Sequence, residues 1–129
     1  MNTINIDFSK SGGIVPVIIQ DYKTSEVLML AYMNEEAYSL SMKTGLAHYW
    51  SRSKKRIWKK GESSGHTQEI REVRIDCDSD TILMKVNQIG DAACHEGYRS
   101  CFFRRVENNK TVIDGEKIFE PSEVYDNKK

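Results

Sequence analysis

The chain has 129 residues, the size of one domain, and its 19 basic and 19 acidic side chains leave no net charge. Hydrophobic residues make up 39% and charged residues 29%, which is typical of a globular protein and gives no overall attraction to nucleic acid. No apolar run has the roughly 18 residues of a membrane span, and the N-terminus has no secretory signal. We expect one cytoplasmic domain, 1–129, with a loose lead-in at 1–13 and a C-terminal extension at 107–129.

The first half of the chain predicts a hairpin followed by a helix. Val15–Tyr22 and Val27–Met33 are β-rich runs separated by a short polar segment, as in a β-hairpin. Asn34 is a good N-cap, and Gly45 can end the helix that Asn34 begins.

The rest of the chain predicts strands separated by loops. The expected strands are Leu46–Ser51, Ile57–Lys60, Glu69–Cys77, Thr81–Gln88 and Cys101–Val106. Gly61–His66 and Gly90–Ser100 are rich in glycine and small polar residues and predict loops. The tail after Asn108–Asn109 can add a short hairpin. The pattern therefore indicates a β-rich α+β fold with one clear helix.

The three cysteines, Cys77, Cys94 and Cys101, are an odd number that fits a disulfide framework poorly. Three thiolates leave one zinc coordination position open for water, which is the arrangement of catalytic zinc sites. Their spacing contains no CxxC pair, and buried core cysteines explain it equally well. His95 beside Cys94 suits proton transfer, although a surface loop histidine would give the same pattern.

Three carboxylates, Asp76, Asp78 and Asp80, crowd into five residues. In an extended segment they share the face opposite Cys77. Their mutual repulsion favours a hard cation such as Mg²⁺, distinct from zinc, although a solvated acidic turn is an alternative of at least equal weight.

A basic and aromatic stretch, Trp50–Lys60, precedes the glycine loop Gly61–His66. Its arginines and lysines suit phosphate groups, and its two tryptophans can stack on a base. The backbone N–H groups and hydroxyls of the loop can cradle a phosphate. A solvated basic turn with two core tryptophans explains the same composition, and a zinc-stabilised nucleic-acid-binding module is the alternative function.

Six segments carry a more specific signal. They are VLMLAYMNEEA (Val27–Ala37), TG (Thr44–Gly45), YWSRS (Tyr49–Ser53), WKKGESSGH (Trp58–His66), DCDSD (Asp76–Asp80) and ACHEGYRSCFFR (Ala93–Arg104). In this order they resemble the phosphoribosyl-AMP cyclohydrolase family of histidine biosynthesis, over about Ile14–Arg105. The resemblance implies hydrolytic opening of the N1–C6 bond of 1-(5-phosphoribosyl)-AMP by zinc-activated water.

The resemblance also implies a fold and a set of metal ligands. The fold is a pseudo-barrel of antiparallel strands capped by a helix, in an intertwined homodimer with zinc ligands from both chains. Zinc is assigned to Cys77, Cys94 and Cys101, and Mg²⁺ to Asp76, Asp78 and Asp80. Neither nucleic acid nor membrane is expected as a partner, and the chain has no room for the pyrophosphohydrolase domain fused to some members.

Candidate catalytic and substrate-binding residues follow from the same motifs. His95 is the first candidate for proton transfer and His66 the second. The candidate substrate-binding residues are Trp50, Ser51, Arg52, Ser53, Lys60, Gly61, Glu62, Ser63, Ser64 and Gly65. Two departures lie beside Cys94: Glu96 replaces a common threonine, and Asp91 is an apparent extra residue.

Overall fold

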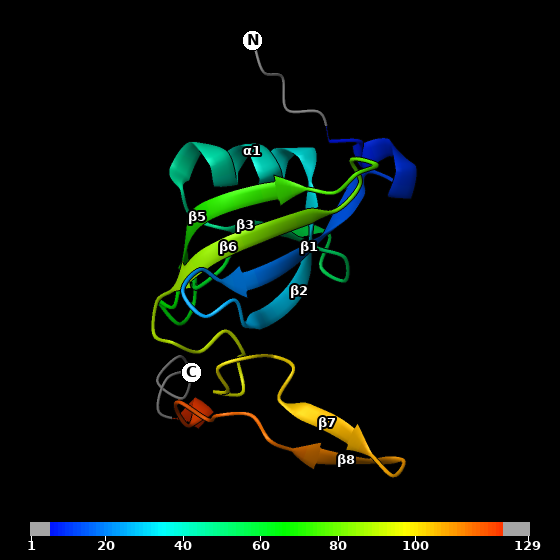
Figure 1. Cartoon of the computed structure of the whole chain (residues 1–129). Coiled ribbons are helices and arrows are strands. Elements are labelled where there is room, and N and C mark those ends of the chain that lie inside the picture. Colours follow the sequence, from blue (N-terminus) through cyan, green and yellow to red (C-terminus); the bar gives the residue numbers. More distant parts are fainter. Residues whose placement is uncertain (1–5, 123–129) are drawn as a thin grey trace.

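The computed structural model describes residues 6–122, so the outer parts of the expected lead-in and extension, 1–5 and 123–129, lie outside the described residues (Figure 1). The helices are η1 (Phe8–Ser11) and α1 (Glu35–Thr44). The strands are β1 (Ile14–Asp21), β2 (Val27–Asn34), β3 (His48–Ser51), β4 (Arg56–Lys59), β5 (Gln68–Ile75), β6 (Ile82–Gln88), β7 (Arg104–Glu107) and β8 (Lys110–Ile113).

The main sheet has four strands in the order β2-β1-β6-β5, and the hairpins β3–β4 and β7–β8 form two separate sheets. The β1–β2 and β5–β6 pairs are antiparallel, as expected, but β1 and β6 run parallel. The β-rich class with one α-helix is confirmed, whereas the expected all-antiparallel, barrel-like arrangement is corrected to an open mixed sheet. Parallel pairing is possible because the long chain between β2 and β6, including α1, returns β6 to the side of β1.

Alternating side chains of the two central strands build the core. The burial pattern of β1 and of β6 has period two, as expected for strands with one face against a core. The fully buried members are Val15, Val17, Ile19, Ile82, Met84 and Val86.

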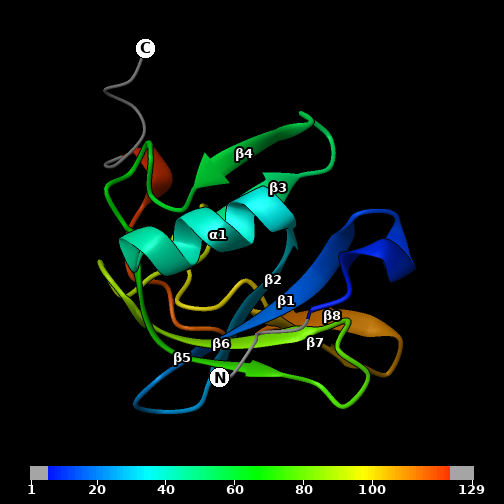
Figure 2. The same ribbon diagram turned by 90° about the horizontal axis from the view of Figure 1, so that it is seen from above.

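Helix α1 begins and ends where its capping residues predict. The Asn34 side chain accepts a hydrogen bond from the Ala37 N–H at 2.8 Å, and the N–H of Gly45, with φ 77°, donates to Ser41 O. The helix contacts β2 and β3 and buries Ala37, Tyr38 and Ser41 (Figure 2). Neither helix of residues 6–122 has the length and apolar character that crossing a membrane requires.

The described part of the lead-in is more ordered than expected. Asp7 caps η1, and its backbone N–H donates to Ser79 O at 2.7 Å. The Phe8 ring lies 6.3 Å from the Tyr38 ring and packs against the core. These contacts join the N-terminal segment to the turn that follows β5, which a local sequence pattern does not reveal.

Three strands have a boundary shifted by two or more residues. The strand expected at Leu46–Ser51 begins at His48. The strand expected at Glu69–Cys77 ends at Ile75, and the strand expected at Cys101–Val106 begins only at Arg104. The Cys101 N–H donates to Leu28 O at 2.7 Å, outside any strand ladder. A short hairpin is expected in the tail after Asn108–Asn109; the tail instead supplies β8, which pairs with β7 through a turn at these two asparagines, both at positive φ.

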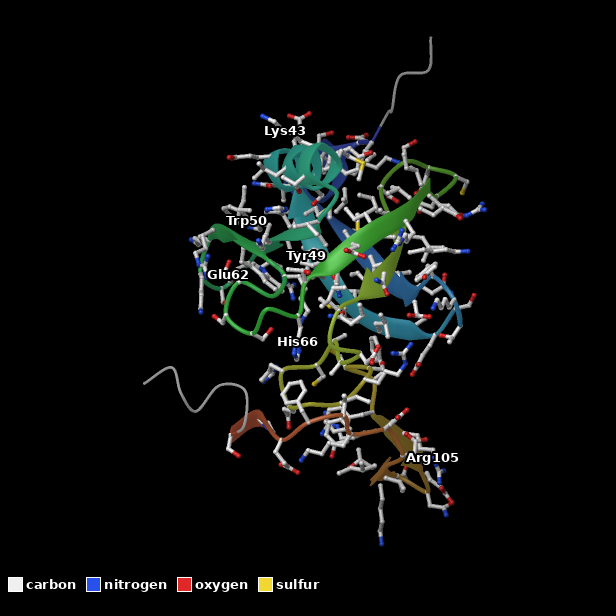
Figure 3. All side chains as sticks on the ribbon, turned by 90° about the vertical axis from the view of Figure 1, so that its left-hand side faces the viewer. Lys43, Tyr49, Trp50, Glu62, His66 and Arg105 are labelled. Atoms are coloured by element: carbon white, nitrogen blue, oxygen red, sulfur yellow. The ribbon has the colours of Figure 1, made fainter. Side chains whose placement is uncertain are left out.

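A buried polar network links β3, β5 and β6. The Tyr49 hydroxyl donates to Gln68 Oε1, and Gln68 Nε2 donates to Gln88 Oε1 at 2.8 Å. Gln88 Nε2 in turn donates to the carbonyls of His66 and Ile89, each at 3.1 Å. Because Gln88 bonds the carbonyl of His66, the network fixes the end of the Gly61–His66 loop. Figure 3 labels Tyr49 and His66, the residues at the two ends of this network.

Replacing Tyr49 by phenylalanine should lower the free energy of unfolding by about 1–3 kcal/mol, because it removes the donor to a buried amide oxygen. Urea unfolding measures this loss. The matched control is Tyr22→Phe at an exposed tyrosine, which should change stability by less than about 0.5 kcal/mol. Equal losses in both variants would contradict the role of the network.

Candidate active site

A cavity of about 450 Å³ lies between the β3–β4 hairpin, the loop after β4 and the segment 93–101. Six of the predicted substrate-binding residues line it: Ser51, Lys60, Gly61, Glu62, Ser63 and Ser64. The other four, Trp50, Arg52, Ser53 and Gly65, are not among its lining residues. The Arg52 guanidinium instead lies 4.0 Å from the centre of the Tyr32 ring.

The wall of the cavity is basic. Lys54, Arg56, Lys59 and Lys60 line it, and Glu62 is the one carboxylate among the described lining residues. Glu62 is already engaged, since it pairs with Arg56 at 2.7 Å and accepts the Lys59 N–H at 3.0 Å. Its hydrogen bond with Arg56 lowers the pKa of the Glu62 carboxyl. The cavity therefore retains an excess of positive charge.

Four basic or aromatic lining residues were missed by the list of candidates, although their signal is visible in the sequence: Lys54, Arg56, Trp58 and Lys59. Arg56 and Trp58 alternate along β4 and so share a face of the hairpin that borders the cavity. Trp58 adds an aromatic surface, and its ring lies 5.2 Å from the Tyr49 ring.

Two of the three cysteines lie close together: Cys101 lines the cavity, and Cys94 lies beside Cys101. Burial and the negative charge of Cys94 raise the pKa of the Cys101 thiol to about 11, against the opposing effect of Lys60. Cys94 is buried, and the Glu96 N–H donates to its sulfur at 3.5 Å.

Hydrogen bonds hold the segment that carries these thiols. The N–H groups of Ala93 and Cys94 donate to the carbonyls of Arg99 and Tyr98, which closes a compact loop. Arg99 pairs with Asp21 at 3.2 Å and with Glu26 at 2.8 Å, at the β1–β2 turn. The positions of both thiols are therefore fixed by the main sheet.

Cys77 lies away from the other two cysteines. It follows the Ile75 end of β5, whereas Cys94 follows the Gln88 end of β6. Because Gln88 pairs with Gln68 at the opposite end of β5, the sheet separates the two cysteines (Figure 1). All three are free thiols. One chain thus brings together Cys94 and Cys101 but not Cys77.

The three aspartates do lie together. One oxygen from each of Asp76, Asp78 and Asp80 lies within 4.8 Å of the others, in the turn after β5. Hydrogen bonds from Asp80 and Asp76 raise the pKa of Asp78, and repulsion by their charges adds to this. Lys10 Nζ lies 3.9 Å from carboxylate oxygens of Asp78 and Asp80, a contact that sequence reasoning missed.

The two candidate histidines differ in position. His95 lines the cavity and is exposed. His66 is not among the lining residues, and its ring packs against Phe119 with centroids 5.2 Å apart. A Cβ added at Gly90 would lie 2.5 Å from the His66 ring, so this contact requires glycine.

Two comparisons with known proteins, by family model and by similar sequences, agree on the family. The phosphoribosyl-AMP cyclohydrolase family model matches residues 29–103. The chain belongs to this family. A phosphoribosyl-AMP cyclohydrolase from Nitratidesulfovibrio vulgaris is 60% identical over 92% of this chain and 94% of its own length. Relatives with the same name from Desulfatibacillum aliphaticivorans and Methanosarcina acetivorans are 55% and 54% identical, each over 95% of this chain and 98% and 99% of their own lengths.

The two departures from the phosphoribosyl-AMP cyclohydrolase pattern have clear positions. Glu96 is exposed, and the bond from its backbone to the Cys94 sulfur does not depend on its side chain. Asp91 has a φ of 61°, and its carbonyl accepts a hydrogen bond from Arg99 at 3.3 Å. Asp91, the apparent extra residue, therefore lies in a left-handed turn before the cavity segment.

The cavity loop requires glycine at its first position. Gly61 has a φ of 87°, and a Cβ there would lie 2.6 Å from the backbone of His66 and Thr67. Gly61→Ala should destabilise the protein and raise KM, because the loop must move. Gly65→Ala is a matched control with a φ of 81° and no atom within 4 Å, so it should cost only about 1–2 kcal/mol. Urea unfolding and KM compare the two; equal effects would contradict this account.

Proposed function

We propose that this chain catalyses the reaction for which its family is named, the hydrolytic opening of the N1–C6 bond of 1-(5-phosphoribosyl)-AMP in histidine biosynthesis. The observation that carries the proposal is the family match over residues 29–103, which include every residue that lines the basic cavity as well as Cys94. The named relatives share more than half of their residues over nearly the whole chain. We place the reaction in the cytoplasm.

The cavity has the chemistry that a nucleotide with two phosphate groups needs. Lys54, Arg56 and Lys59 supply positive charge, and Ser63 and Ser64 supply hydroxyl groups. Trp58 offers an aromatic face for the purine ring. We assign the phosphate groups to these three cations and the base to the region of Trp58, close to His95 and Cys101.

The donor set suits zinc. Cys94 and Cys101 are free thiols, Cys101 lines the cavity beside Lys60, and the Glu96 N–H donates to the sulfur of Cys94. Thiolates are preferred zinc ligands, and a three-thiolate site leaves one position open. We propose that Cys77 of a second copy completes the set in a homodimer. When bound, zinc would lower the pKa of a water molecule toward 7 and so provide hydroxide at neutral pH.

The same dimer would bring the aspartates to the cavity. Cys77 lies between Asp76 and Asp78 in the chain, so a partner that contributes this cysteine also contributes the carboxylate cluster. Three carboxylates within reach of one ion suit Mg²⁺, whose positive charge would relieve their repulsion. We propose that these carboxylates would hold Mg²⁺ and that the ion would supply positive charge for orienting the phosphate groups of the substrate.

His95 is the better candidate for proton transfer. It lines the cavity, whereas His66 packs against Phe119 outside the lining. We propose that His95 delivers a proton to N1 as the ring opens. His66 then serves to hold the end of the glycine loop.

The activity can be tested by following ring opening of phosphoribosyl-AMP in the ultraviolet. The wild-type protein should turn over substrate, and removal of metal by a chelator should abolish turnover, which added zinc restores. His95→Ala should retain zinc and lose at least about 100-fold in kcat, because general acid catalysis contributes about this much. Full turnover without metal would contradict the zinc proposal.

Mixing two inactive variants tests whether the site spans two chains. Cys77→Ser and Cys94→Ser should each be inactive, but subunit exchange should restore about a quarter of wild-type activity, because half of the randomly formed dimers contain one intact site. The matched control mixes Cys94→Ser with Cys101→Ser. In this control every site lacks a thiol, so no activity should return. Activity in the control mixture, or no activity in the mixture of Cys77→Ser with Cys94→Ser, would contradict a site shared between two chains.

A further inference from the structure

Lys60 differs from the other cations of the cavity in what its side chain contacts. Its ammonium group donates to the Ala93 carbonyl at 2.6 Å, which joins the end of β4 to a segment 33 residues later. Ala93 directly precedes Cys94. The Lys60 N–H also donates to Ala47 O at 3.0 Å, so both ends of this residue are fixed. Lys54 and Arg56, in contrast, are exposed at the rim.

The ammonium group is placed to act on both thiols. Lys60 and Cys101 both line the cavity, and Cys94 directly follows the Ala93 carbonyl that the ammonium group contacts. A positive charge therefore lies beside the segment that carries two proposed zinc ligands.

A zinc site with three thiolates needs a nearby positive charge. Three thiolates and one Zn²⁺ ion leave one net negative charge, and burying an uncompensated charge is costly. Groups that contact metal ligands from outside the coordination sphere commonly change metal affinity by roughly 10–100-fold. Lys60 is the cation that contacts the backbone next to Cys94 among the described residues.

We propose that Lys60 is a positioning residue for the metal, which neutralises the thiolate site and holds the Ala93–Cys94 backbone, and that it is not a phosphate ligand. The inference rests on the proposed function, because it assumes that Cys94 and Cys101 bind zinc. It revises the sequence-based assignment of Lys60 to substrate binding. Phosphate recognition then falls to Lys54, Arg56 and Lys59, whose side chains make no such contact with the thiol segment.

The test compares zinc affinity and KM in a set of variants of the full chain. Competition with a chromophoric chelator measures zinc affinity, with circular dichroism and sedimentation confirming fold and oligomeric state. Lys60→Met removes charge and hydrogen bond, Lys60→Gln keeps a donor without charge, and Lys60→Arg keeps both. Lys54→Met is the matched control, since it removes an exposed lysine of the same cavity.

Lys60→Met and Lys60→Gln should lose roughly tenfold or more in zinc affinity, whereas Lys60→Arg should restore most of it. At saturating zinc their KM should stay near the wild-type value. Lys54→Met should show the opposite pattern, with unchanged zinc affinity and a raised KM. If Lys60→Met does not fold, the comparison of Lys60→Gln with Lys60→Arg decides.

Wild-type zinc affinity together with a raised KM in the Lys60 variants would overturn the inference and make Lys60 a substrate ligand. That result would leave the proposed function intact, because the wild-type protein would still bind zinc. A wild-type protein that binds no zinc would instead overturn the proposed three-thiolate site, and this inference with it.

Discussion

The antiparallel pairing of β5 with β6 sets the geometry on which the candidate site depends. Ile75 pairs with Ile82 at one end of the two strands, and Gln68 pairs with Gln88 at the other. Cys77 follows the first end and Cys94 the second, so roughly 20–25 Å of strand lies between them at about 3.3 Å per residue. A zinc ion binds each sulfur at about 2.3 Å. A three-thiolate site is therefore incompatible with one chain in this fold and requires a second copy.

The opposite end of the same sheet positions the cavity. The segment that carries Cys94 and Cys101 follows β6 and is bound back to the β1–β2 turn through Arg99. Across the cavity, the buried network through Gln88 holds the carbonyl of His66. Lys60 connects the two sides through Ala93. The thiols, the basic wall and the glycine loop thus share one framework.

Local signals in the sequence predict much of this fold. The β1–β2 hairpin, the β3–β4 pair and the caps of α1 follow from β-rich runs, Asn34 and Gly45, because each depends on residues close in the chain. The parallel pairing of β1 with β6 depends on residues more than 60 positions apart, and no local pattern specifies it. The docking of η1 on the turn after β5 is a contact of the same kind.

The candidate site, too, is predicted only in part from the sequence. Motifs locate the glycine loop and the aspartate cluster, since these are continuous in the chain. They do not show that Arg52 turns to Tyr32, or that Lys60 reaches Ala93, because both depend on which side chains meet in three dimensions. The separation of Cys77 from Cys94 likewise requires the strand register.

X-ray absorption spectroscopy of the zinc-loaded protein tests whether three thiolates bind the metal, because it counts the sulfur ligands. A single chain of this fold can offer only Cys94 and Cys101 to one ion among its three cysteines. The account predicts three sulfur ligands at about 2.3 Å per zinc ion, with the third supplied by a second copy. Two sulfur ligands in the dimeric, zinc-loaded protein would contradict it.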